Sequence, residues 1–90
     1  MAYNHIVDNT ATVVTSGKVR KAAVQVNAAL TGTITVYDAI GSATTPVVAI
    51  ITNPTVGSRY EFWDFQTGFK VTASTNCDIT AMSDGSHGPK

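Results

Sequence analysis

The chain has 90 residues, a formal net charge of zero, and charged residues at only 13% of its composition. This length fits a single domain. The charge balance disfavours nucleic acid as a partner, because proteins that bind it carry a clear positive excess. A surface this poor in charge favours association with other protein surfaces.

The first and last segments of the chain are expected to lie outside the core. Residues 1–10 are mixed in character and predict an extended arm, whereas residues 83–90 are rich in glycine and have no apolar anchor. Such a C-terminal segment is typical of a flexible tail. The core of the single domain, which spans 1–90, is therefore expected at 11–82.

Side chains branched at Cβ dominate the composition and predict an all-β fold. Valine and isoleucine together number 17, threonine numbers 14, and leucine occurs once, at Leu30. Branched side chains lose rotamer freedom in a helix and pack well on a pleated sheet. We therefore expect a small antiparallel β-sandwich, jelly-roll-like, with six to eight short strands.

Seven segments between the two ends have the length and the alternating or apolar pattern of strands. In chain order they are 11–16, 18–28, 33–38, 47–52, 59–65, 69–74 and 77–82. Turn signals such as Gly32 and Asn53-Pro54 separate them. Short connections predict that two pairs of successive segments form hairpins, one within 18–38 and one within 68–82.

Two of these predicted strands are apolar on both faces, although a sandwich buries only one face of each sheet. One carries Val48 and Ile50 on its second face, and the other carries Trp63 and Phe65. A large exposed apolar patch on a small protein usually marks an association site. We expect these four residues to form the subunit interface of a homo-oligomer. The alternative is a bulge in 59–65 that turns both aromatic sets inward.

The sequence predicts no catalytic, cofactor or metal site, and so no enzyme. His5 and His87 lie near opposite ends of the chain, whereas a metal site needs three or four rigidly held ligands. The single cysteine, Cys77, excludes an internal disulfide and is expected to be a small buried apolar residue. Asp38 and Asp78 lie next to turns, where carboxylates commonly accept hydrogen bonds from nearby backbone amides.

The sequence also gives expectations about location. No apolar run reaches the roughly 18 residues of a membrane-spanning helix. The N-terminus lacks the basic region and apolar core of a secretory signal. We therefore expect no membrane partner and synthesis in a cytoplasm, which the protein leaves only as part of a larger particle.

Five of the seven aromatic residues fall within ten positions, and a sugar-binding platform is one interpretation of this cluster. Its members are Tyr60, Phe62, Trp63, Phe65 and Phe69. A platform requires an exposed Trp63 with polar neighbours such as Arg59 and Asp64. Packing in the core and in an interface is the simpler interpretation.

Three segments lie within or beside the predicted strands: TITVYD at 33–38, TGFKVTAS at 67–74 and DIT at 78–80. These segments resemble parts of small structural proteins of tailed-bacteriophage virions. With the stretches between them, the resemblance covers about 17–82. Similar patterns occur in head decoration proteins, head fibres and other appendages, and they contain no catalytic residue.

The resemblance implies a capsid decoration, or cement, protein that binds the outer surface of a phage head and bridges neighbouring capsomers. It would be made in the host cytoplasm and end on the virion. Its partners would be the major capsid protein and further copies of itself, with a trimer favoured. The alternatives are another virion appendage, such as a head-fibre base, connector or tail component, and, less favoured, a glycan-binding module.

Contacts with the shell are expected from the N-terminal region and from the one basic cluster of the sequence. An extended segment can add a strand to a sheet edge of its partner, and symmetry multiplies many weak contacts. The residues expected at this contact are Tyr3, His5, Val7, Val13, Lys18, Arg20 and Lys21.

Overall fold

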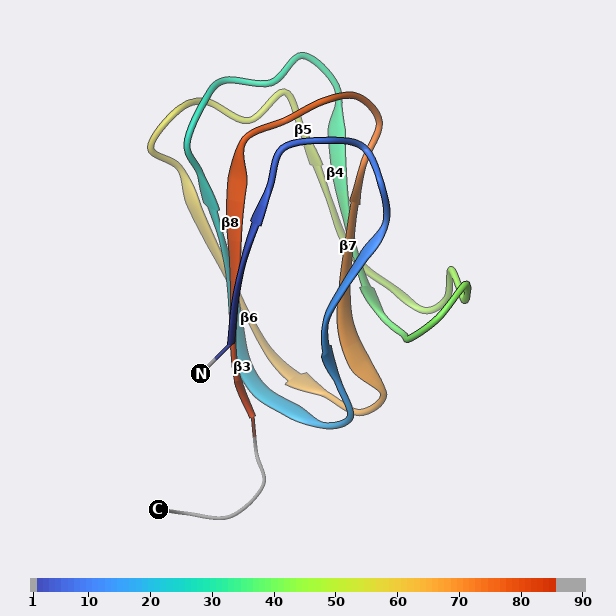
Figure 1. Cartoon of the computed structure of the whole chain (residues 1–90). Helices are drawn as coiled ribbons and strands as arrows, with labels where there is room; N and C mark the ends of the chain where they lie inside the picture. The colour runs from blue at the N-terminus through green and yellow to red at the C-terminus, as the bar shows by residue number, and fades with distance from the viewer. Residues whose placement is uncertain (1, 86–90) are drawn as a thin grey trace.

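The computed structural model describes residues 2–85, and side chains for 4–84, as eight strands in two layers (Figure 1). The layer that we name sheet A has the strand order β1 (Ala2–Ile6), β8 (Ile79–Gly85), β3 (Val19–Val26) and β6 (Arg59–Phe65). Sheet B has the order β2 (Thr12–Ser16), β7 (Gly68–Ala73), β4 (Thr33–Asp38) and β5 (Val47–Thr52). Within the described residues, no helix is long and apolar enough to cross a membrane.

The strand pairing identifies the sandwich as a jelly roll. The first strand pairs with the eighth, the second with the seventh, the third with the sixth and the fourth with the fifth, all antiparallel. This nested pairing results when one long antiparallel ribbon is wrapped into two layers. Two further ladders, β3 with β8 and β4 with β7, complete the sheets. The predicted all-β, jelly-roll-like sandwich of six to eight strands is confirmed.

Neither of the two predicted hairpins forms. β3 and β4 belong to different sheets, as do β7 and β8, so each connection crosses from one layer to the other. Each of these strands turns one apolar face toward the core, and crossing lets these faces meet between the sheets. The hairpin that does occur is β4–β5, joined by the loop 39–46.

The segment predicted as a free arm is a strand of sheet A. β1 pairs with β8 from Ala2 opposite Ser83 to Ile6 opposite Ile79, and the side chain of Ile6 is buried. One buried residue in a polar segment is too weak a pattern to predict a strand. At the other end, the first three residues of the predicted tail belong to β8, and residues 86–90 lie outside the described part of the chain.

The core lies between the sheets and consists mainly of branched aliphatic side chains around two phenylalanines. The rings of Phe65 and Phe69 have their centroids 5.3 Å apart. Thr15 of β2 and the buried Ser83 of β8 form a hydrogen bond that links the two layers. The largest fully buried side chains are Phe65, Phe69, Ile34, Ile79, Val19, Val24, Val26, Val36 and Val71.

The end of β6 departs from the alternation expected of a strand. Asp64 has a left-handed φ of 66°, which is uncommon for a residue other than glycine and redirects the chain. Trp63 remains on the surface, whereas Phe65, expected on the same face, is only 2% exposed. Phe65 therefore belongs to the core, which corrects its expected place in a subunit interface.

Candidate functional site

The exposed cationic side chains of residues 4–84 gather on and around the outer face of sheet A. They are Lys18, Arg20, Lys21 and Arg59. Arg20 lies 3.8 Å from Asp84, while Lys21 and Arg59 lie 3.9 and 3.1 Å from Glu61. Exposed pairs of this kind contribute little to stability. These pairs make the outer face of sheet A rich in charge, with positive and negative side chains in nearly equal number.

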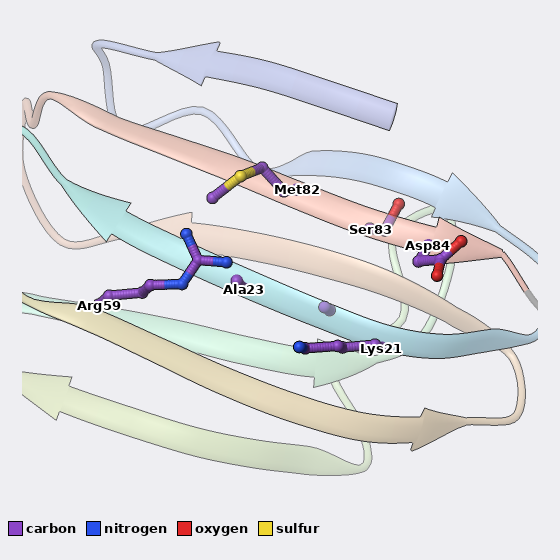
Figure 2. A pocket seen from close by; sticks show the side chains of 7 residues that line it. Lys21, Ala23, Arg59, Met82, Ser83 and Asp84 are labelled. Carbon is purple, nitrogen blue, oxygen red and sulfur yellow. The ribbon is translucent and has the colours of Figure 1, made fainter. Parts of the chain in front are cut away.

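A shallow depression lies near the middle of this face (Figure 2). Met82 from β8 and Arg59 from β6 stand on either side of Ala23 on β3, and the short alanine leaves a cavity of about 70 Å³. A second, open depression of about 260 Å³ lies beside Arg20 and Gln66, at the end of β6. Sites that enclose a small molecule usually measure about 300–1,000 Å³, so both depressions are small for such a ligand.

Trp63 stands on the outer face of sheet A, in register with Lys21. Its side chain is 57% exposed, and the Nζ of Lys21 lies 6.0 Å from the centre of its ring. Trp63 is thus exposed, as a sugar platform requires. Its polar neighbour is Lys21, and within the part of the chain that the structure describes, no contact of its ring with the expected Arg59 or Asp64 is observed.

The outer face of sheet B has the opposite character. Its strand residues are mainly threonines and apolar side chains, with Tyr37, and the one cation among them, Lys70, is buried. No strand residue described on this face exposes a charge. The side chains on it are Val13, Thr33, Thr35, Tyr37, Val47, Val48, Ile50, Thr52 and Thr72.

The burial of Lys70 results from the loop 39–46, which projects on the outer side of sheet B (Figure 1). The Nζ of Lys70 donates a hydrogen bond of 2.7 Å to the carbonyl oxygen of Ala43 and lies 5.4 Å from the ring centre of Tyr37. A buried ammonium group requires such partners, because leaving water is costly for a charge. The loop thus removes the one positive charge from this face.

Strand β5 carries the most extensive exposed apolar surface of sheet B. Val47, Val48 and Ile50 are 48%, 42% and 62% exposed. Val48 and Ile50 are therefore on the surface, as expected for an interface. Trp63 is exposed too, but on the outer face of the other sheet, so the structure does not bring these three residues together.

The residues expected to contact a shell form two separate groups. The first, on the side of the sandwich where β1 and β2 are edge strands, contains Tyr3, His5, Val7 and Val13. The second, at the β2–β3 turn and the start of β3, contains Lys18, Arg20 and Lys21. In the first group, His5 and Val7 are exposed, and Val13 is partly exposed.

His5 is held by a hydrogen bond that the sequence does not predict. Its Nε2 donates to the carboxylate of Asp78 at 2.6 Å, and the side-chain amide of Asn27 donates to the same oxygen at 3.2 Å. The hydrogen bond from His5, and then that from Asn27, hold the pKa of Asp78 below its usual value. Asp78 therefore binds side chains, in place of the nearby backbone amides expected. Among the described residues, no three His, Cys, Asp or Glu side chains are placed to hold a metal ion.

Asp38 links the end of β4 to the turn between β6 and β7 through hydrogen bonds. Its carboxylate accepts hydrogen bonds from the backbone N–H groups of Gln66, Thr67 and Gly68 at 2.9, 2.7 and 3.2 Å. Backbone amides were expected, but these lie 28–30 residues further along the chain. Burial raises the pKa of Asp38, but the three hydrogen bonds lower it by more, so the carboxylate is held ionised.

Cys77 is partly buried, where full burial was expected, and it packs against the core. Its thiol donates to the carbonyl oxygens of Ile6 and Asp8 at 3.6 and 3.5 Å. Burial raises the pKa of the Cys77 thiol, and the charges of Asp8 and Asp78 raise it further. The reactive thiolate is therefore disfavoured, which is typical of a structural cysteine.

Comparison with known proteins supplies no relative for this chain. No model of a protein family matches it, and searches of curated proteins and of solved structures gave no significant match. The functional interpretation therefore depends on the jelly roll and on its two unlike outer faces.

Proposed function

We propose that the protein is a structural component of a tailed-bacteriophage virion: a decoration protein that binds the outside of the head and stabilises the shell. The observation that carries this proposal is a jelly roll, completed within residues 2–85, with one charged and one charge-free outer face. Jelly rolls recur in viral capsid proteins and in lectins. Together with the resemblance of three segments to virion proteins, the fold favours a role in a particle.

The surface chemistry supports binding to a protein lattice. The two depressions, of about 70 and 260 Å³, are small for an enclosed ligand. A lattice partner needs no pocket, because weak contacts repeated by symmetry add up to tight binding. The proposed partners are the major capsid protein and further copies of the chain, without nucleic acid, membrane, cofactor or catalysis.

The proposed contact with the shell uses side chains of the folded domain. Residues 2–6 already pair with β8, so they do not form a free arm that could add a strand to the shell. Contact is proposed instead through the exposed His5 and Val7 and through the basic cluster of Lys18, Arg20 and Lys21. These two groups lie at opposite ends of sheet A, because His5 and Ile6 are level with Gln25 and Val26 at the end of β3, whereas the basic cluster is at its start. This separation suits a domain that touches two neighbouring subunits of the lattice.

Electron cryomicroscopy of the virus particle tests this proposal. We expect the domain at hundreds of symmetric positions on the outer surface of the head, because a cement protein bridges capsomers throughout the shell. A few copies at one vertex or along the tail would support the appendage alternative instead. Purified particles that lack the protein would rule out both.

Variants then test the proposed contact on shells prepared without the protein. Arg20→Glu combined with Lys21→Glu should reduce the number of bound copies at least tenfold. Arg59→Glu is the matched control, since Arg59 is an exposed cation of the same sheet outside the proposed contact. Equal loss of binding in the control, or no loss in the double variant, would contradict the assigned contact.

A glycan-binding module is the second candidate, favoured by the exposure of Trp63. The sequence has a single tryptophan, so intrinsic tryptophan fluorescence reports on Trp63 alone. For a decoration protein, we expect no change when oligosaccharides of several classes are added. A saturable shift in fluorescence with one of them would replace the decoration proposal with the glycan-binding one.

A further inference from the structure

The described residues contain four sheet edges: β1 and β6 in sheet A, and β2 and β5 in sheet B. An edge strand presents unpaired backbone N–H and C=O groups, to which another strand can bind. Folded proteins usually protect their edges with charged side chains, bulges, or very short strands. The four edges of this jelly roll differ in how they are protected.

Three of the edges have a recognisable protection. β6 carries the charged Arg59, Glu61 and Asp64, and the left-handed φ of Asp64 distorts the end of the strand. β1 and β2 have only five residues each, and β2 also contains a register shift between Val13 and Thr15. These features make each of the three edges a poor template for pairing.

β5 is the edge without such protection. Its sequence, VVAIIT, has no charged residue and no proline. The register shift in its ladder with β4 lies at its beginning, and Ala49–Thr52 pair regularly. Exposed valine and isoleucine side chains on β5 therefore lie directly beside backbone groups that are free to pair.

We infer that β5 is the interface between two copies of this chain, which pair antiparallel through their β5 edges and join the two B sheets into one continuous sheet. Centring this pairing on Ile50 places its side chain, 62% exposed in the single chain, against its own copy. Val48 then lies opposite Thr52 of the second copy. The same contact would give the free backbone groups hydrogen-bond partners and would bury the exposed apolar side chains.

A second copy fits this edge for two reasons. Two identical strands without charge meet with no like-charge repulsion, and antiparallel pairing of identical segments closes as a two-fold dimer. The same side of the sandwich also has an incomplete core, since Ala49 of β5 and Tyr60 and Phe62 of β6 are only partly buried against it. A second sheet placed there extends this core. The inference replaces the trimer expected from the resemblance with a dimer.

Sedimentation of the purified full chain tests the inference. We expect the wild type to sediment at twice its mass of 9.4 kDa at high concentration and to dissociate on dilution. Ile50→Lys should weaken this self-association at least tenfold, because it places two lysines against each other. Val56→Lys is the control: Val56 is 65% exposed but lies outside β5, so this variant should dimerise as the wild type does.

Hydrogen exchange of the wild type keeps the test decisive if Ile50→Lys fails to fold. The amides of β5 that point away from β4 should be protected at high concentration and lose protection on dilution, while those of β3 and β8 stay protected. A monomer at all concentrations, a trimer, or β5 protection that does not depend on concentration would each overturn the inference. The measurements use isolated protein, so a failure here leaves the proposed binding to a shell untouched.

Discussion

Phe65→Ala is expected to lower the free energy of unfolding by about 3–5 kcal/mol, as truncations of buried phenylalanine do. Phe65 is 2% exposed and packs against Phe69 and Phe62. A domain of 90 residues has a total stability of roughly 5–13 kcal/mol. The variant therefore loses a large share of its stability, which denaturant unfolding followed by circular dichroism will measure.

Trp63→Ala is the matched control for this experiment. Trp63 lies two residues earlier on the same strand but is 57% exposed, so its removal should change stability by less than about 1 kcal/mol. If the two variants lost equal amounts of unfolding free energy, the result would contradict the placement of Phe65 in the core and of Trp63 on the surface.

Asp38→Asn is expected to lower the free energy of unfolding by about 1.5–3 kcal/mol at neutral pH, the usual range for hydrogen bonds to a charged group. The amide that replaces the carboxylate keeps one acceptor oxygen but loses the charge that strengthens the bonds from Gln66, Thr67 and Gly68. The midpoint temperature of thermal unfolding should fall by roughly 6–24 °C for a domain of this size.

We also expect Asp38→Asn to change how the free energy of unfolding depends on pH. The pKa of Asp38 is lower in the folded state than its ordinary value of 3.8, so its contribution is complete above that value. The contribution is lost as the pH falls through the lower, folded-state pKa. The stability of the wild type should therefore approach that of Asp38→Asn below pH 4.

Asp64→Asn is the control for the loss of a negative charge nearby. Asp64 is exposed at the end of β6, and asparagine tolerates its left-handed backbone. This variant should keep the stability and the acid sensitivity of the wild type. A constant difference in stability between wild type and Asp38→Asn from pH 7 to pH 2 would contradict the role given to the carboxylate.

Local pattern is sufficient to place most strands of this protein but does not determine their partners. The branched side chains and turn residues predict the positions of seven strands, because both act over a few residues. Pairing depends on contacts between distant segments, such as Ala2 with Ser83. The two expected hairpins are the clearest example, because short connections suit a crossing between layers as well as a turn within one sheet.

Local pattern also predicts which side chains are exposed better than it predicts which of them lie on the same surface. Apolar residues on both faces of a strand correctly indicate that Val48, Ile50 and Trp63 are exposed. Alternation does not show that they lie on different sheets, nor that Asp64 reverses the side-chain directions after Trp63. The burial of Lys70 depends on a loop from another part of the chain and has no signal in its own strand.

The nested pairing of the strands has a consequence for synthesis of the chain. β8 lies between β1 and β3 in sheet A, so β1 has no neighbour to pair with until residues 79–85 have left the ribosome. Strand pairing between distant segments is also slow, on the order of milliseconds to seconds. Sheet A therefore cannot be completed until the last strand is made, although every strand of sheet B has been synthesised by then. A chain that stops short of β8 leaves β1 without a partner and retains only the β3–β6 pair of sheet A.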